Sequence, residues 1–200
     1  MDEELAWVIQ AQQGSEDAFT QIVETYQKPV YNLCYRMLGE AEAAEDAAQE
    51  TFLRVYQHLH RYDQKRPFAT WLLSIAAHYC IDRLRKRKFA IFSIDAEDDE
   101  GSVIELPDPG SPDPERESIK REDREQLHGL LQSLDSTDRA AVVMRYWYDF
   151  SEIEIAESLR LTVSAVKSRL HRARRALAGR WQEDRSEFQT HRRPHESPAI

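Results

Sequence analysis

Residues 149–177, DFSEIEIAESLRLTVSAVKSRLHRARRAL, constrain the fold most, because they encode the start of one helix, its end and the start of a second. Ser151 and Glu154 form the S-x-x-E capping box, in which each side chain bonds a backbone N–H left unpaired at a helix start. A turn at residues 160–162 follows, and Thr162 is placed to cap the second helix. This pattern predicts a helix-turn-helix whose second helix fits the major groove of DNA.

Both helices of this motif are amphipathic. By steps of three and four, the residues expected to be buried are Ile155, Ala156, Leu159, Val166, Leu170, Ala173 and Leu177. The exposed side of the second helix then consists of Lys167, Ser168, Arg169, His171, Arg172, Arg174 and Arg175. From Arg160 to Arg180 there are seven Lys or Arg residues and no acidic one, although the chain carries a net charge of −9. A solvated basic face is the alternative, but cations segregated against an acidic average favour an anionic partner.

The rest of the chain predicts an all-α protein, because helical steps dominate and glycine is scarce. In the N-terminal part we expect helices at about residues 2–13, 15–38, 42–61 and 68–89. Pro29 falls inside the second of these, so we expect a break or kink near Lys28. The expected core positions are Phe19, Ile22, Val23 and Tyr26, then Phe52, Val55, Tyr56 and Leu59, then Trp71, Leu72, Ile75 and Ala76.

Two charged surfaces are expected on these helices. The third helix has a face of acidic and amide side chains, which consists of Glu42, Glu45, Asp46, Gln49 and Glu50. The alternative interpretation of this face is simple solvation. The fourth helix ends in a basic run from Arg83 to Lys88. The density of cations in this run favours a phosphate partner over simple exposure to solvent.

An acidic segment divides the chain into two small helical domains. Residues 93–117 contain four prolines, two glycines and ten carboxylates, which is typical of a flexible linker. We therefore expect domains at 1–92 and 118–181, and a disordered tail at 182–200. Cys34 and Cys80 are expected as small core residues. No apolar run is long enough for membrane insertion and the N-terminus is acidic, so a cytoplasmic protein is expected.

Three motifs in order resemble the extracytoplasmic-function sigma factors of bacterial RNA polymerase. They are DAAQETFLRVYQHL (46–59), FATWLLSIAAHYCIDRLRKRK (68–88) and, after the acidic segment, a helix-turn-helix ending AVKSRLHRARRAL. The resemblance covers roughly residues 5–180. It implies a transcription initiation factor that binds core polymerase, directs it to promoters, helps to open the duplex, and catalyses no reaction itself.

The resemblance also implies roles for particular residues. The segment implied to dock on the largest polymerase subunits contains Asp46, Gln49, Glu50, Phe52 and Leu53. The region implied to read and melt the minus-10 element contains Tyr62, Lys65, Arg66, Phe68, Trp71, His78, Arg83, Arg85, Lys86, Arg87 and Lys88. Within it, the loop 62–68 is expected to capture an unstacked base, with Tyr62 and Phe68 as stacking surfaces. The alternative for Phe68 and Trp71 is that both are simply core residues, and for Trp71 this reading is the favoured one. Phe52 combines a core position with a possible anchoring role.

The second domain resembles the part that reads the minus-35 element, at Ser164, Lys167, Ser168, Arg169, His171, Arg172, Arg174 and Arg175. Lys167, Ser168, His171 and Arg172 fall at base-facing positions, whereas Arg169, Arg174 and Arg175 are implied phosphate ligands. The chain departs from the family at His78, where asparagine is common, at Ser164-Ala165, where Gly-Thr is frequent, and at Arg160, where a turn glycine is usual. A side chain at such a left-handed position either strains the turn or goes with a turn of different shape.

The implied partners are core RNA polymerase, promoter DNA and an anti-sigma factor, with the protein at the nucleoid when in holoenzyme or held at the membrane through the anti-sigma factor. No cofactor, metal site or catalytic residue is expected. A helix-turn-helix regulator that acts as a dimer without polymerase is the alternative function, but it leaves residues 62–88 unexplained. The acidic segment has two readings: a nucleic-acid mimic in a cationic polymerase channel, or a plain tether.

Overall fold

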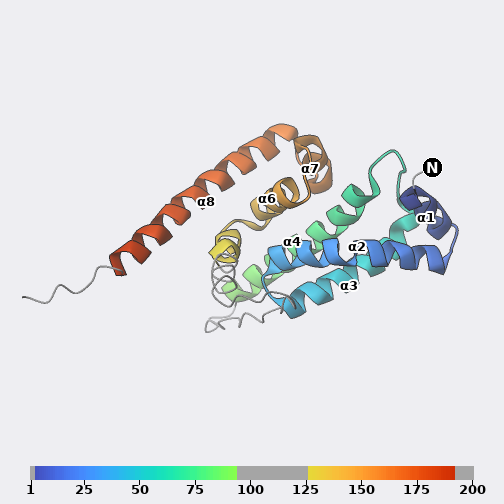
Figure 1. Ribbon diagram of the computed structural model, residues 1–200, viewed down its shortest axis with the longest axis horizontal. Coiled ribbons are helices and arrows are strands. Elements are labelled where there is room, and N and C mark those ends of the chain that lie inside the picture. The colour runs from blue at the N-terminus through green and yellow to red at the C-terminus, as the bar shows by residue number, and fades with distance from the viewer. Residues whose placement is uncertain (1–2, 94–125, 192–200) are drawn as a thin grey trace, which may run out of the picture.

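The computed structural model describes the backbone of residues 3–93 and 126–191, and the side chains of residues 3–90 and 126–180. These residues confirm the all-α prediction, since they contain helices and no strand. In chain order the elements are α1 (Glu3–Gln12), α2 (Glu16–Leu38), α3 (Ala41–His58), the 3-10 turn η1 (Leu59–Arg61), α4 (Phe68–Ser93), a helical stretch at 126–132, α6 (Ser136–Trp147), α7 (Glu152–Leu159) and α8 (Val163–His191). Figure 1 shows α1–α4 as one bundle, with α6 and α7 between that bundle and α8.

Local signals explain where α2 begins and ends. The Ser15 hydroxyl accepts a hydrogen bond from the Ala18 N–H, and Gly39 ends the helix in the left-handed conformation with φ 91°. The expected break near Lys28 is wrong, because α2 is continuous through Pro29. Proline inside a helix costs about 3 kcal/mol, but α2 is packed in the core both before and after Pro29, with Ile22 and Val30 fully buried, and such packing can override local propensity.

The first bundle, α1–α4, buries most of the predicted apolar stripes. Its fully buried side chains include Val8, Ile22, Leu33, Val55 and Leu72. Cys34 and Cys80 are buried and free, as predicted. One stripe is partly wrong: Tyr56 is 55% exposed. Its ring meets Phe19 of α2 in an edge contact, at a centroid distance of 5.0 Å, but the side chain otherwise stays accessible to solvent.

Two helices are longer than predicted. Helix α4 continues to Ser93, so the basic run lies inside the helix rather than at its end. Helix α8 continues to His191, so the expectation of a disordered tail is wrong for residues 182–191. In both cases the sequence contains no proline or glycine between the predicted and observed ends, so nothing local stops the helix.

Helices α6, α7 and α8 form the second bundle. Ile155, Ala156, Leu159, Val166, Leu170 and Ala173 are buried as predicted, and Leu177 is half-buried. The sequence patterns used above did not assign α6. This helix is capped by Asp135, whose side chain accepts from the Thr137 N–H, and it supplies buried residues such as Val143 and Met144.

The two bundles pack directly against each other. The sequence predicted two domains joined by a flexible linker and gave no indication of this contact. Tyr148 donates its hydroxyl proton to the Pro29 carbonyl at 2.6 Å. The Arg36 guanidinium lies 5.1 Å from the centre of the Trp147 ring. A Cβ on Gly39 would approach the His128 side chain to 2.7 Å, so the end of α2 sits tightly against the second bundle.

Arg139 is the centre of this contact. Its side chain, 4% exposed, donates to the Met37 carbonyl at the end of α2. It also donates to the Gln132 carbonyl at 2.8 Å and the Leu134 carbonyl at 3.2 Å. Burial lowers the pKa of Arg139 to about 10, so the group is still a cation at neutral pH. Its charge lies at the carbonyl ends of two helices, where the helix dipole favours a cation.

Several predictions fall outside the described residues. These are the acidic segment beyond Ser93, with its mimic and tether readings, the start of the second domain at 118–125, and the end of the tail at 192–200. Within the described ranges, no helix combines the length and the apolar character that crossing a bilayer requires.

Candidate nucleic-acid interface

The helix-turn-helix has the geometry that its sequence predicts. Both halves of the Ser151–Glu154 capping box are formed. The Thr162 hydroxyl accepts from the Ala165 N–H at 3.1 Å and so caps α8. Between the helices, Arg160 adopts the left-handed conformation with φ 55° and ψ 46°. This is the conformation that glycine adopts without strain. The turn therefore keeps the backbone conformation expected for glycine, although Arg160 occupies the position.

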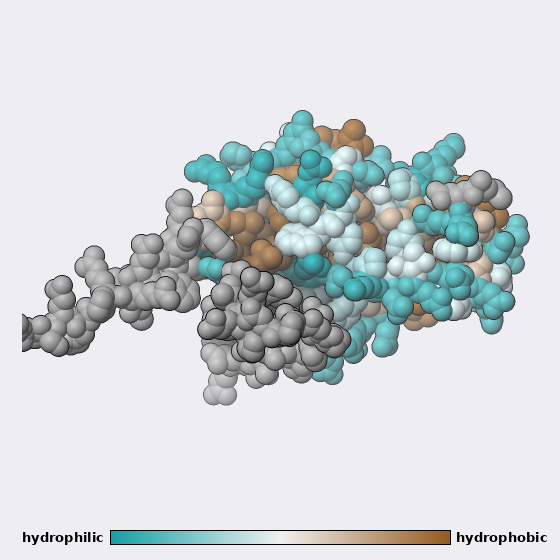
Figure 2. Space-filling view, viewed as in Figure 1, coloured by the Kyte–Doolittle hydropathy of each residue, from teal (hydrophilic) through white to brown (hydrophobic). Residues whose placement is uncertain are grey.

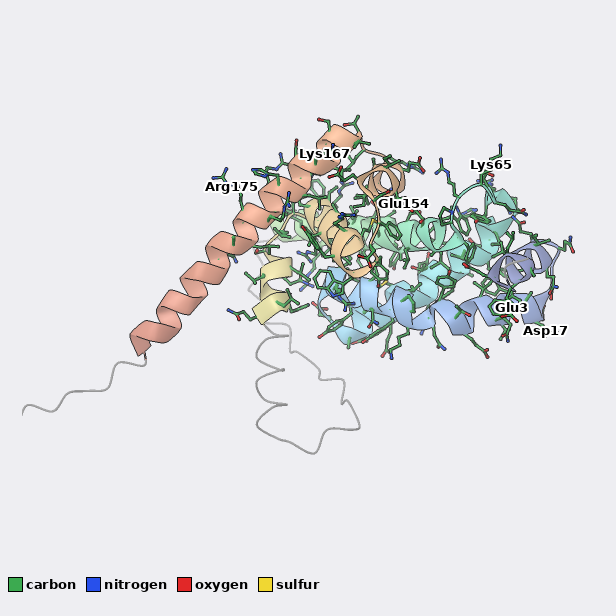
Figure 3. The ribbon with its side chains drawn as sticks, turned by 45° about the horizontal axis from the view of Figure 1, so that its top comes forward. Glu3, Asp17, Lys65, Glu154, Lys167 and Arg175 are labelled. Carbon is green, nitrogen blue, oxygen red and sulfur yellow. The ribbon has the colours of Figure 1, made fainter. Side chains whose placement is uncertain are left out.

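The predicted DNA-facing side of α8 is largely exposed. Ser164, Lys167, Ser168, His171, Arg172, Arg174 and Arg175 are all exposed. Figure 3 shows Lys167 and Arg175 pointing outward from α8. Lys167 has an ion pair with Glu152 at 3.6 Å, in which both side chains remain accessible. In Figure 2, hydrophilic side chains gather along the upper left edge of the described residues, where Figure 1 places the first part of α8.

Arg169 differs from the rest of this face. Its side chain is only 28% exposed and lies 2.5 Å from Asp138 and 3.8 Å from Asp135. The sequence pattern placed Arg169 among the exposed cations. The pattern missed the carboxylates of α6, which lie against α8 in the fold but 31 and 34 positions earlier in the chain.

The loop at residues 62–68 rests on a cluster of aromatic rings. Tyr62 and Phe68 are 7% and 5% exposed, and their ring centroids are 5.2 Å apart. Trp71 is half-buried against both rings, and Tyr26 packs on Phe68 at 5.6 Å. The expectation that Tyr62 and Phe68 offer open stacking surfaces is therefore wrong for this conformation, because residues from α2 and α4 cover them.

Gln12 of α1 hydrogen-bonds the backbone at the start of the loop. The Gln12 amide donates to the Leu59 carbonyl at 2.9 Å and to the Tyr62 carbonyl at 3.2 Å. Lys65 and Arg66 remain exposed at the tip, where Figure 3 shows Lys65 projecting away from the body. Gln12 was not singled out in the sequence, since one amide in a helix gives no local signal of such a role.

The acidic residues of α7 lie next to this loop. Arg66 and Glu157 form an ion pair at 3.7 Å. Hydrogen bonds from the Ser151 backbone, then from its hydroxyl, lower the pKa of Glu154, and Thr70 at the start of α4 adds to the effect. Glu154 is thus ionised at neutral pH. The second bundle therefore places two carboxylates beside the first turn of α4.

The basic run on α4 is partly neutralised inside the fold. Arg83 pairs with Asp46 at 3.5 Å, and Arg87 pairs with Glu40 at 2.6 Å. Arg85 donates to the Thr137 hydroxyl at 3.4 Å. The remaining two cations are exposed, namely Lys86 and Lys88. His78, which stands where asparagine is common, is half-buried, and its Nδ1 lies 2.9 Å from the Ser74 carbonyl.

The structure brings four of the five predicted docking residues of α3 together. A surface hollow of about 350 Å³ is lined by Asp46, Gln49, Glu50, Leu53 and Tyr79. Leu53 is 51% exposed at this hollow. Phe52 does not line it and packs half-buried against the core. Tyr79 of α4 was missed in the sequence; its ring carries the Arg54 guanidinium at 4.8 Å, and Arg54 also pairs with Glu50 at 2.7 Å.

Both bundles match known families. Residues 22–90 match the family described as Sigma-70 region 2, and residues 124–177 match the family described as Sigma-70, region 4. The chain is 38% identical over 171 residues to the ECF RNA polymerase sigma factor SigW of Bacillus subtilis (strain 168), which covers 84% of this chain and 91% of the relative. It is 31% identical over 172 residues to the RNA polymerase sigma-H factor of Pseudomonas aeruginosa (strain PAO1), covering 85% and 89%.

Solved structures share this fold over most of the chain. The structure of CnrH in complex with the cytosolic domain of CnrY superposes with a TM-score of 0.68 at 23% identity and covers 92% of this chain and 99% of that one. The sigma factor RpoE in complex with the anti-sigma factor NepR from Bartonella quintana gives a TM-score of 0.65 at 21% identity, covering 82% and 95%.

Proposed function

Because the chain belongs to the extracytoplasmic-function sigma factors of the sigma-70 family, we propose that it directs core RNA polymerase to promoters through three separate surfaces. The α3 hollow binds polymerase. The loop at 62–68 and the start of α4 bind the minus-10 element. The exposed face of α8 binds the minus-35 element.

The α3 hollow is the observation that carries this proposal. It combines two carboxylates and an amide with an exposed leucine and a tyrosine ring. Anionic groups around an apolar centre are complementary to a basic helical partner with apolar anchors. Glu50 and Asp46 are already paired with arginines of this chain. On binding, basic groups of the polymerase would therefore replace these arginines as the partners of the two carboxylates. Tyr79 joins the docking residues, and Phe52 supports them from the core.

At the minus-10 surface, the exposed cations bind DNA phosphates before a base is captured. Lys65 and Arg66 at the loop tip, with Lys86 and Lys88 further along α4, supply phosphate contacts. Tyr62 and Phe68 are buried beneath the loop. A flipped base can stack on these rings only after the loop opens, so we propose that base capture is coupled to loop movement. His78, tied to the backbone of its own helix, and Trp71 border this site.

At the minus-35 surface, exposure favours Lys167, Ser168, His171 and Arg172 as the base-facing group. Arg174 and Arg175, further from the start of α8, suit phosphate contacts. Ser164 lies one residue into the helix, where backbone N–H groups and the helix dipole favour a phosphate.

We also propose an anti-sigma factor as a regulatory partner, since the RpoE structure named above is a complex of a sigma factor with an anti-sigma factor. The protein would then be located at the nucleoid in the holoenzyme and with its anti-sigma factor otherwise.

Core binding is testable by gel filtration of the purified chain with and without core polymerase. The chain alone should elute as a monomer, and it should co-elute with core when mixed. The double variant Gln49→Ala, Leu53→Ala should bind core about tenfold more weakly, since truncating central contacts costs more than about 1 kcal/mol. Gln57→Ala changes an exposed glutamine of the same helix outside the hollow and should bind like wild type. A stable dimer that ignores core polymerase would support the dimeric regulator instead.

A further inference from the structure

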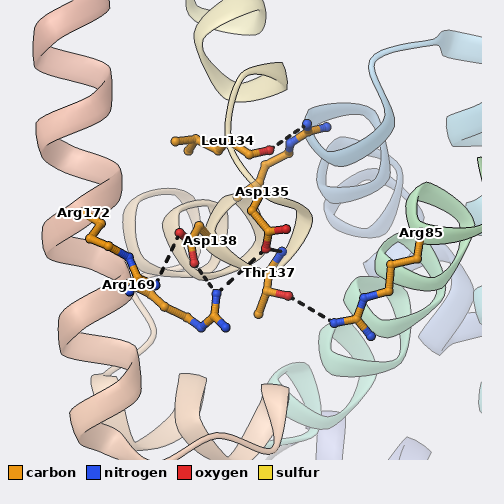
Figure 4. A network of polar contacts seen from close by, with 8 residues as sticks. Arg85, Leu134, Asp135, Thr137, Asp138, Arg169 and Arg172 are labelled. Carbon is orange, nitrogen blue, oxygen red and sulfur yellow. Dashed lines mark hydrogen bonds and ion pairs between the residues drawn. The ribbon is translucent and has the colours of Figure 1, made fainter. Parts of the chain in front are cut away.

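Asp138, in the first turn of α6, contacts two arginines of the DNA-facing helix. Its side chain is 14% exposed, and one carboxylate oxygen lies 2.5 Å from the Arg169 guanidinium. The other oxygen lies 3.8 Å from the guanidinium of Arg172, one turn further along α8. Figure 4 shows both arginines reaching from α8 toward this one carboxylate. A single acidic group therefore faces two cations that the sequence pattern assigns to DNA.

The two arginines are held to different degrees. Arg169 is 28% exposed and also lies 3.8 Å from Asp135, so it is fixed between two carboxylates. Arg172 is 62% exposed, and its distance of 3.8 Å from Asp138 is an ion pair without a hydrogen bond. Arg169 is thus anchored inside the fold, whereas the head of Arg172 is only restrained and can reach outward.

We propose that Asp138 is a positioning residue for minus-35 readout. It fixes Arg169 as a strut between α6 and α8 and withholds it from DNA phosphates. It also restrains the rotamer of Arg172, so that this guanidinium meets base edges in one orientation. This inference rests on the proposed role of α8 at the minus-35 element.

The chemistry of guanidinium groups supports this assignment. Readout of guanine by arginine needs a planar fork in a fixed orientation, and long side chains read accurately only when a supporting residue limits their rotamers. A carboxylate beside the DNA also repels phosphate, so Asp138 should lower affinity for all sequences while it sharpens the choice among them. This combination separates a positioning role from a purely structural one.

Asp138→Asn tests the proposal in holoenzyme reconstituted with core polymerase. Binding is measured on promoter fragments randomised in the minus-35 element, at several salt concentrations. The variant should lose about tenfold in discrimination at the base pair read by Arg172. The released Arg169 should gain about one phosphate contact, which steepens the slope of log K against log salt by about 0.9. Non-preferred sequences should bind as tightly as before, or more tightly.

Asp149→Asn is the matched control. It removes the same charge from the same bundle, and Asp149 is exposed. Its φ of 55° is one that asparagine tolerates, and none of the ion pairs among the described residues includes it. It should change neither preference nor slope. In a background of Arg172→Ala, Asp138→Asn should no longer alter base preference, because the residue through which it acts is gone.

A second variant keeps the test decisive if Asp138→Asn lowers the unfolding temperature. Arg169→Gln should leave the salt slope unchanged, because Arg169 contacts no phosphate in the wild type, whereas Arg175→Gln should flatten it by about 0.9. If Arg169→Gln flattens the slope of log K against log salt, Arg169 contacts phosphate in the wild type and the proposal that Asp138 withholds it from DNA is wrong. Equal loss on every sequence in Asp138→Asn, without a slope change, leaves Asp138 a structural residue. If wild-type holoenzyme itself shows no preference at this element, the proposed function fails as well.

Discussion

Replacing Arg139 by methionine tests whether the two bundles depend on one buried cation. The guanidinium donates to three carbonyls, those of Met37, Gln132 and Leu134. Methionine fills a similar volume but donates nothing. Each buried carbonyl that loses its donor costs about 1 kcal/mol or more, while the removed charge no longer needs burial. We therefore expect the free energy of unfolding to fall by about 3 kcal/mol.

The assay is urea unfolding of the full chain, followed by tryptophan fluorescence, because Trp147 lies at the contact between the bundles. Arg145→Met is the matched control on the same helix. Arg145 is exposed and donates a single bond, to the Phe150 carbonyl at 2.8 Å, so its loss should cost about 1 kcal/mol or less. Equal effects of the two substitutions would refute the role given to the buried carbonyl site.

Three further predictions concern single residues. Burial, then the charge of Arg139, lowers the pKa of His128 below 6.5. The contribution of neutral His128 to the free energy of unfolding is therefore complete above pH 6.5 and falls as the pH drops toward the pKa of the folded state. His128→Gln should remove this part of the pH dependence of the free energy of unfolding. Arg160→Gly relieves a left-handed side chain and should raise the free energy of unfolding by about 1 kcal/mol; a decrease would show that the turn is unstrained. Arg172→Ala should relax base preference in the minus-35 element, whereas Arg175→Ala should weaken binding evenly, and a binding-site selection that finds the reverse exchanges their roles.

Features encoded by neighbouring residues could be predicted from the sequence. The capping box of Ser151 and Glu154, the cap at Thr162 and the buried stripe of α8 are formed as expected, because each depends on residues within one or two helical turns. Pro29 and the end of α4 were mispredicted for the complementary reason. Local propensity favoured a break or a stop, and packing against other helices, or the lack of any stop signal, decided otherwise.

Features that depend on distant residues could not be predicted. Arg139 looks like a surface cation, and only the fold surrounds it with carbonyls from two bundles. Tyr62 and Phe68 were expected in the open because nothing in the loop sequence shows that Tyr26 and Trp71 cover them. The α3 residues that line the hollow were among the predicted docking residues, because they follow helical spacing, but the hollow itself and Tyr79, which lines it from α4, were not predicted.

Run-off transcription with core polymerase on a pool of genomic promoters tests the central claim most directly. Purified protein added to core should produce transcripts from a subset of promoters that share sequences at the minus-10 and minus-35 positions. Core alone should produce none of these transcripts, and the Gln49→Ala, Leu53→Ala variant should produce fewer at limiting protein. If the wild-type protein yields no transcript beyond those of core alone, the assignment of polymerase-dependent promoter recognition to this chain is contradicted.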